Sequence, residues 1–180
     1  MQLSPLQLLE YTFGGVSVMP VDGYVADPEF PPALVFFPGK LALTAETSLQ
    51  QLNEENNYSD FKVSLKLCVA PKEGAEAPYQ VQVFVSGVVR IHLSKTDGQA
   101  EERRVRAFVN GVSLLYGVIR EMVVNITSRS VHGQFLLPSL NFADLADLPP
   151  DSSKSPLAPA LAAAKPKVKK QVKAKTLLIK

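Results

Sequence analysis

Apolar and polar residues alternate along four stretches in the first half of the chain. Residues 61–69, FKVSLKLCV, show the pattern most clearly, because Phe, Val and Leu take turns with Lys, Ser and Cys. A two-residue period is typical of a β-strand with one buried face. The pattern predicts four strands, over about residues 8–19, 40–50, 60–70 and 79–93.

Glycines and turn residues indicate how these strands bend and connect. We expect a β-bulge at Ser86-Gly87, where the alternation of the fourth strand breaks, and a similar bend at Gly14-Gly15 in the first. Residues 71–78, PKEGAEAP, are short and rich in turn formers. They predict an antiparallel hairpin between the third and fourth strands.

The second half of the chain changes to a helical period. Apolar residues recur at one, three and four positions and stack on one side of a predicted helix from about residue 101 to residue 130: Leu114, Leu115, Val118, Ile119, Met122, Val123 and Ile126. Asn110-Gly111 is a weak point where we expect a kink. The helix has more apolar surface than one sheet can cover, so the sequence predicts a multimer. The residues expected to face another subunit are Val112, Tyr116, Val123 and Val124.

Residues 21–39 form a crossover loop between the first two predicted strands. Its four prolines forbid regular strand pairing. The loop is nevertheless rich in aromatic residues, including Phe30, Phe36 and Phe37, each of which would cost about 1.5 to 3 kcal/mol if left exposed. These side chains therefore cover something, in the same subunit, in a neighbour or in a client.

The order of features after residue 112 resembles the C-terminal half of the SecB export-chaperone family. In that family a long helix with an Arg-Glu pair ends in Ser-Arg, and an apolar linker leads to Pro, Asn-Phe and a short helix. The matching elements here are Arg120-Glu121, Ser128-Arg129, the run 135–138 and Asn141-Phe142. The N-terminal half agrees in layout, so the resemblance covers roughly residues 6–148.

The resemblance implies a fold, an assembly and a binding region. The fold is α+β, with a four-stranded antiparallel sheet, a long crossover loop between strands 1 and 2 and a long C-terminal helix packed on the sheet. The assembly is a dimer of dimers, a homotetramer. The resemblance also implies an apolar groove that binds unfolded polypeptide. The alternative is that the residues of this groove belong to the ordinary hydrophobic core of the subunit. The groove candidates are Phe30, Phe36, Phe37, Phe135, Leu137, Leu140 and Phe142.

Charge and composition divide the chain into a domain over residues 1–150 and a basic tail over residues 151–180. The tail holds eight Lys and one Asp, a net of +7, which leaves −5 for the domain in a chain of net charge +2. Its proline, alanine and lysine content predicts disorder. The tail either keeps the protein in solution or docks weakly on an anionic partner such as RNA, a ribosome or a membrane surface. Family tails engage the SecA motor, and this tail departs from them, which leaves SecA as an open partner.

Residues suited to catalysis do not form a recognisable motif. There is no nucleophile elbow, Walker loop or dinucleotide fingerprint. His92, His132 and Cys68 share no metal-ligand spacing, and Cys68 lies within a strand pattern. We therefore expect neither enzymatic activity nor a cofactor or metal. A single cysteine, and the lack of a leader pattern, favour a cytoplasmic protein.

Together these observations favour an ATP-independent holdase that binds unfolded polypeptides before export, translocation or hand-over. Two alternatives stay open. One is a dedicated SecB-like chaperone for the antitoxin of a toxin-antitoxin pair. The other is a scaffold that binds nucleic acid or membrane through its basic tail.

Overall fold

The protein forms a single antiparallel sheet with one long helix packed on it. The computed structural model describes residues 4–25, 41–55, 57–92 and 99–147. The strands are β1 (Leu6–Pro20), β2 (Leu41–Glu55), β3 (Tyr58–Pro71) and β4 (Tyr79–His92), followed by α1 (Ala100–Thr127) and the short 3-10 helix η3 (Ala143–Asp147). Neighbouring strands pair antiparallel in the order β1-β4-β3-β2. The predicted α+β fold and its four strands are confirmed.

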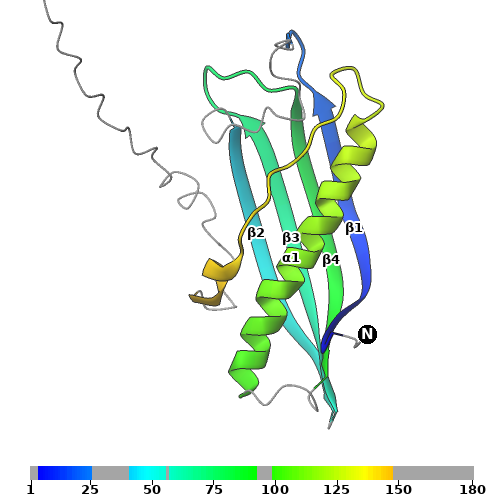
Figure 1. Ribbon diagram of the computed structural model, residues 1–180, viewed down its shortest axis with the longest axis vertical. Coiled ribbons are helices and arrows are strands. Elements are labelled where there is room, and N and C mark those ends of the chain that lie inside the picture. Colours follow the sequence, from blue (N-terminus) through cyan, green and yellow to red (C-terminus); the bar gives the residue numbers. More distant parts are fainter. Residues whose placement is uncertain (1–3, 26–40, 56, 93–98, 148–180) are drawn as a thin grey trace, which may run out of the picture.

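The core lies between α1 and the inward face of the sheet. α1 crosses that face diagonally and packs on β4, β3 and β1 (Figure 1). Alternate strand residues such as Val63, Leu65 and Val85 are fully buried, as are Leu115 and Ile119 of the helix. α1 is long and apolar enough to span a membrane by length and composition alone, but 44% of its most apolar window is buried inside the domain, as in a core helix.

Of the two bends predicted in the sheet, the one in β1 is confirmed and the one in β4 is not. β1 shifts register between Leu8 and Glu10 and again between Phe13 and Gly15, so the bend at Gly14-Gly15 is confirmed. The bulge predicted at Ser86-Gly87 is wrong, since β4 keeps its register through that pair. Gly87 is needed for a different reason. A Cβ there would lie 2.9 Å from the Glu10 carbonyl oxygen.

α1 continues as one helix through Asn110-Gly111, the pair predicted to be a weak point or kink. Gly111 lets the helix approach β3 closely. A Cβ at this position would lie 2.7 Å from Cγ2 of Val63, which is fully buried and cannot move aside. The glycine therefore reflects packing between layers rather than flexibility of the helix.

Two glycines of the same helix should respond in opposite ways to replacement by alanine. Gly117→Ala should stabilise the domain by about 0.5 to 1 kcal/mol, because alanine favours helix and nothing lies within 4 Å of the new Cβ. Gly111→Ala adds the same helix preference but overpacks the contact with Val63, at about 1 to 3 kcal/mol. Urea unfolding measures both. Equal stabilities for the two variants would mean that α1 does not approach β3 as described.

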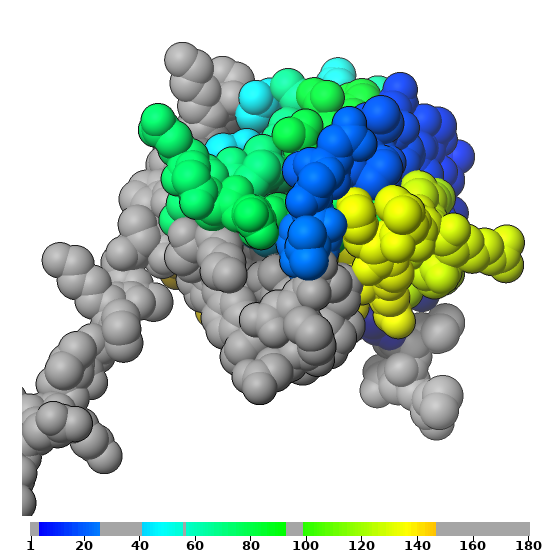
Figure 2. Space-filling model, turned by 90° about the horizontal axis from the view of Figure 1, so that it is seen from above, coloured from blue at the N-terminus to red at the C-terminus, as the bar shows by residue number. Residues whose placement is uncertain are grey.

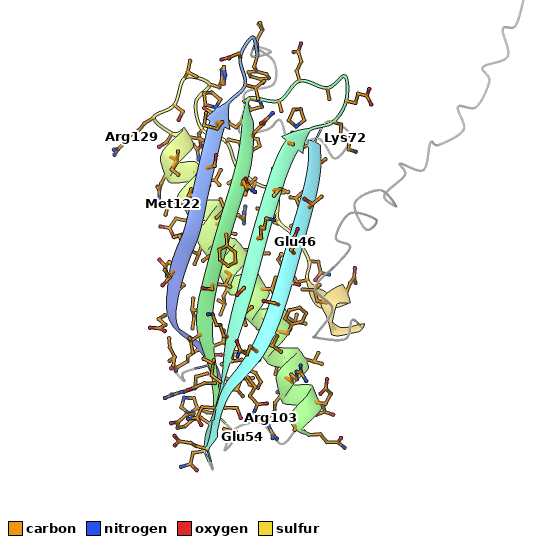
Figure 3. The ribbon with its side chains drawn as sticks, turned by 180° about the vertical axis from the view of Figure 1, so that it is seen from behind. Glu46, Glu54, Lys72, Arg103, Met122 and Arg129 are labelled. Carbon is orange, nitrogen blue, oxygen red and sulfur yellow. The ribbon has the colours of Figure 1, made fainter. Side chains whose placement is uncertain are left out.

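The outward face of the sheet is left uncovered by the described elements. Figure 3 views this face, with α1 behind the strands. The Arg90 guanidinium forms a bidentate ion pair with Asp60, at 2.7 Å to each carboxylate oxygen, and lies 3.8 Å from the centre of the Tyr58 ring. The hydrogen bond from Arg90 to Asp60 raises the pKa of the guanidinium further above its ordinary value. This cluster joins β3 to β4 near one end of the sheet.

Candidate polypeptide-binding site

The chain after α1 turns back through residues 128–133 and runs along the helix as an extended linker, residues 134–142. Three side chains of α1 hold its backbone. The Thr127 hydroxyl accepts a hydrogen bond from the Phe135 N–H at 2.9 Å, Arg120 Nε donates to the Leu137 carbonyl at 3.1 Å, and the Tyr116 hydroxyl donates to the Pro138 carbonyl at 2.6 Å. The linker therefore runs antiparallel to the helix (Figure 1).

The protonation state of Tyr116 suits this role. Burial raises the pKa of the Tyr116 phenol well above its ordinary value, so the hydroxyl keeps its proton and can donate. The ring also meets the Phe142 ring edge-on, with centroids 5.3 Å apart. Tyr116 thus holds both the linker and the residue that leads into η3.

The linker residues predicted to line a groove lie in the core. Phe135 and Leu137 have no exposed surface, and Phe142 is nearly as buried. Leu140 is partly buried against the same core. Phe135, Leu137 and Phe142 are therefore core residues of the subunit, as the alternative reading expected, because side chains buried to this extent cannot touch a client in this conformation. The other candidates, Phe30, Phe36 and Phe37, lie outside the described residues.

The turn that joins α1 to the linker is attached to the end of β1. The Tyr79 hydroxyl donates to the Gly133 carbonyl at 2.8 Å and accepts from the His132 N–H at 3.2 Å. His132 Nε2 lies 3.1 Å from the Val21 carbonyl, and the ring packs edge-on against Tyr24 and Tyr79. Figure 2 looks down on this end, where the yellow turn lies beside the blue end of β1. These contacts fix the start of the crossover loop.

The residues predicted to face another subunit mostly face the sheet instead. Val112 and Val123 are fully buried and Tyr116 is 4% exposed, all in the core of the subunit. Their assignment to an interface is wrong, because α1 uses that side to pack on its own sheet. Val124 alone of the four keeps part of its surface exposed.

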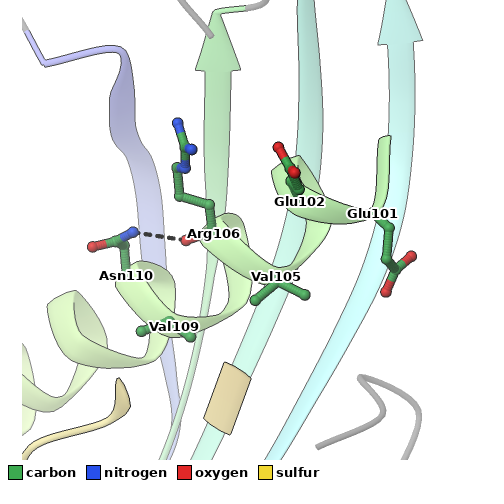
Figure 4. A pocket seen from close by; sticks show the side chains of 6 residues that line it. All are labelled: Glu101, Glu102, Val105, Arg106, Val109 and Asn110. Atoms are coloured by element: carbon green, nitrogen blue, oxygen red, sulfur yellow. Dashed lines mark hydrogen bonds between the residues drawn. The ribbon is translucent and has the colours of Figure 1, made fainter. Parts of the chain in front are cut away.

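A shallow groove of about 400 Å³ lies along the first three turns of α1, and we call it the helix groove. Val105 and Val109 form its floor, and the lining is almost entirely apolar. Figure 4 shows these two valines on one side of the helix with Glu101 near them, whereas Glu102 and Arg106 point to the other side. The remaining lining residue, Asn110, donates its amide to the Arg106 carbonyl at 2.8 Å. The groove offers apolar contact, a charged rim and no catalytic group.

A second apolar surface follows the edge of the domain at β1, and we call it the edge stripe: Tyr11, Val16, Leu114, Val118 and Met122. Three of its members leave large parts exposed, with Tyr11 at 50%, Leu114 at 41% and Val16 at 39%. The helix residues of the stripe follow one another at four-residue spacing, which places them on one edge of α1. Figure 3 shows Met122 beside β1.

Sequence reasoning missed both surfaces and the three residues that hold the linker. The three residues that hold the linker could have been found, because Tyr116, Arg120 and Thr127 have polar groups among the apolar positions of the helix. The two surfaces left no comparable signal. Which apolar helix residues stay exposed depends on the angle at which α1 crosses the sheet.

Within the described residues, no three His, Cys, Asp or Glu side chains gather in a way that could hold a metal ion. Cys68 lies on β3 and is partly exposed. His92 ends β4, whereas His132 contacts Tyr24 and Tyr79 at the opposite end of the sheet.

Comparison with known proteins gives structural likeness only. No protein-family model matches the sequence, and no curated protein matches it. A Streptococcus agalactiae protein of unknown function aligns with 75% of this chain and 97% of its own, at 8% identity and a TM-score of 0.49. A SecB-like chaperone of Mycobacterium tuberculosis, in complex with a ChAD peptide from the HigA1 antitoxin, aligns with 76% of this chain and 90% of its own, at 17% identity and a TM-score of 0.48. At these values neither likeness decides the family.

Proposed function

We propose that this protein is an ATP-independent holdase that binds non-native polypeptides before their export or hand-over. The observation that carries the proposal is the helix groove, an open and almost wholly apolar surface on the principal helix. None of the described residues covers this surface, and an exposed apolar patch often marks a binding site. The sequence order that resembles the SecB family supports the same function.

The geometry suits polypeptides of many sequences. Apolar side chains of a client can pack on Val105 and Val109. This surface is open and apolar, so it can accept any aliphatic or aromatic side chain. β2 is the outer strand on the side of the sheet where η3 lies (Figure 1), and among the described strands it pairs only with β3. Its outer backbone N–H and C=O groups, which pair with none of the described strands, can pair with an extended chain of any sequence.

The sequence has no nucleotide-binding motif, so binding and release in this proposal need no nucleotide. The proposal places the protein in the cytoplasm, without enzymatic activity, where clients are met before they fold. Affinity then comes from many weak apolar contacts, and a client leaves when it folds or meets a stronger acceptor.

The proposed assembly is a homotetramer, a dimer of dimers, and the edge stripe is its proposed contact surface. Tyr11 and Val16 lie opposite Gly87 and Val83 of β4, so they point to the α1 side of the sheet, yet both stay exposed because β1 is the last strand. Leu114 continues the apolar surface onto the helix. Burial of such a stripe by the same stripe of a second copy would satisfy two-fold symmetry.

Aspartate substitutions at two valines distinguish client binding in the groove from binding to any exposed apolar residue. Val105→Asp puts a charge on the groove floor and should weaken binding of an unfolded probe protein at least ten-fold, because the apolar contact is lost and a carboxylate must be desolvated. Val131→Asp is the matched control. It changes an even more exposed valine, at 77%, beyond the other end of α1, and should bind normally. Fluorescence anisotropy of the labelled probe measures both, and equal losses would remove the groove from the proposal.

A further inference from the structure

The domain and the C-terminal tail of this chain are suited to bind each other. The domain has a net charge of −5 over residues 1–150, and residues 151–180 have a net charge of +7. The lysines are followed by Leu177, Leu178 and Ile179, an apolar run one residue before the end of the chain. A basic segment that ends in aliphatic residues is complementary to an acidic body that exposes an apolar groove.

The helix groove is the described surface that fits this segment. Its floor is aliphatic, and its open, shallow shape suits surface contact with a short aliphatic run of chain. Glu101 and Glu102 place two exposed carboxylates on its rim, where lysines that precede the apolar run can pair with them. Arg106 also lines the groove, and Arg103 and Arg104 lie on the same turns of α1, so attraction for the lysines comes from the net charge of the whole domain rather than from the groove itself.

The point at which the described chain ends favours the tail over other occupants. η3 ends at Asp147 and packs against α1, and Figure 1 shows it beside the first half of that helix. About 30 residues separate Asp147 from Leu177. A random-coil chain of that length has a root-mean-square span of roughly 30 Å, more than the 20 Å or so of the half of α1 beside which η3 lies. The tail therefore reaches the groove easily and is present there at an effective concentration of roughly millimolar.

We propose that the C-terminal segment around Leu177, Leu178 and Ile179 occupies the helix groove of its own subunit and competes there with clients. Competition with clients rests on the proposed function, because the tail and the client would bind the same helix groove. A tethered competitor keeps the groove covered when no client is present and yields to a client with several apolar segments. If the tail fills the groove nine-tenths of the time, it weakens the apparent client affinity about ten-fold.

Crosslinking of the full chain tests where the tail binds. Cys68→Ser removes the native thiol, and Lys180→Cys accepts a benzophenone-maleimide probe next to the apolar run. After illumination, mass spectrometry of peptides should find crosslinks concentrated in residues 101–110. The matched control carries the same probe with Leu177, Leu178 and Ile179 replaced by serine and the other lysines kept, and it should lose these crosslinks. Crosslinks spread over the domain equally in both chains would overturn the proposal.

Client affinity provides the second readout. The probe is fluorescein-labelled, reduced and carboxymethylated α-lactalbumin, which stays unfolded. The serine variant should bind it about 3- to 10-fold more tightly than the natural chain at low salt, with a smaller difference at 0.5 M salt, where the lysines are screened. Equal affinities at both salt concentrations would overturn the competition. If neither chain binds the probe while groove crosslinks persist, the holdase function fails and tail docking stands.

Discussion

Phe135→Ala should destabilise the domain by about 3 to 5 kcal/mol, enough to unfold a domain whose total stability is of the usual 5 to 15 kcal/mol. The ring has no exposed surface and packs on Tyr79, with centroids 5.7 Å apart. Its backbone N–H is held by the buried Thr127 hydroxyl. Removing the ring leaves a cavity at the place where the linker is fixed to the helix. Thermal and urea unfolding of the purified variant measure the loss.

Two neighbouring substitutions serve as controls for that result. Leu136→Ala changes the next side chain, which is 39% exposed, and should cost less than about 1 kcal/mol. Thr127→Val keeps the shape of the side chain but leaves the Phe135 N–H without a partner, at about 1 to 3 kcal/mol. If Phe135→Ala kept the parent stability and lost only client binding, the residue would belong to the groove predicted from the sequence rather than to the core.

Glutamate at two positions of α1 should give two different failures. Val123→Glu buries a carboxylate at a site with no exposed surface and no partner, and should unfold the subunit. Leu114→Glu places the same charge in the edge stripe, where 41% of the leucine is exposed. It should keep the fold and split the proposed tetramer into smaller species.

Circular dichroism and multi-angle light scattering separate these outcomes. We expect a folded natural chain with a mass of about four subunits of 19.6 kDa, a folded Leu114→Glu variant of lower mass, and a Val123→Glu variant without a cooperative melt. A folded Val123→Glu variant of reduced mass would restore the interface predicted from the sequence. A natural chain of one-subunit mass would remove the multimer altogether.

The strands and the helix could be predicted from the sequence because their side chains repeat with a fixed period. The alternation over residues 61–69 predicted the buried face of β3 residue by residue. The predicted strand ends agree with the structure to within two residues, except that β2 continues to Glu55 rather than to about residue 50. The packing partner of α1 was predictable too, because one apolar sheet face and one apolar helix face are complementary.

The direction in which each helix residue points could not be predicted with the same accuracy. Val123 and Leu114 belong to one apolar set in the sequence, yet the first is buried and the second is exposed. The difference arises from the way α1 lies across the sheet, which buries Val123 and leaves Leu114 partly at the surface. Periodicity along a single helix contains no information about that arrangement.

The groove on the linker was mispredicted for a related reason. An extended apolar run after a helix is consistent with either an open groove or a strand-like segment that completes the core. The deciding contacts are made by Tyr116, Arg120 and Thr127, which satisfy the backbone of the linker and so allow it to be buried. Gly111 suggested a weak point in the helix for a similar reason, because the sequence does not distinguish a glycine needed for close packing from one at a bend.

The measurement that tests the holdase proposal most directly is client aggregation without nucleotide. A thermally labile client protein is heated with the natural chain, the Val105→Asp variant or the Val131→Asp control, and light scattering is followed over time. The proposal predicts that the natural chain and the Val131→Asp control suppress scattering at about stoichiometric concentration, while Val105→Asp does so poorly although it is equally folded. Full client aggregation in the presence of excess, well-folded natural chain would contradict the proposal.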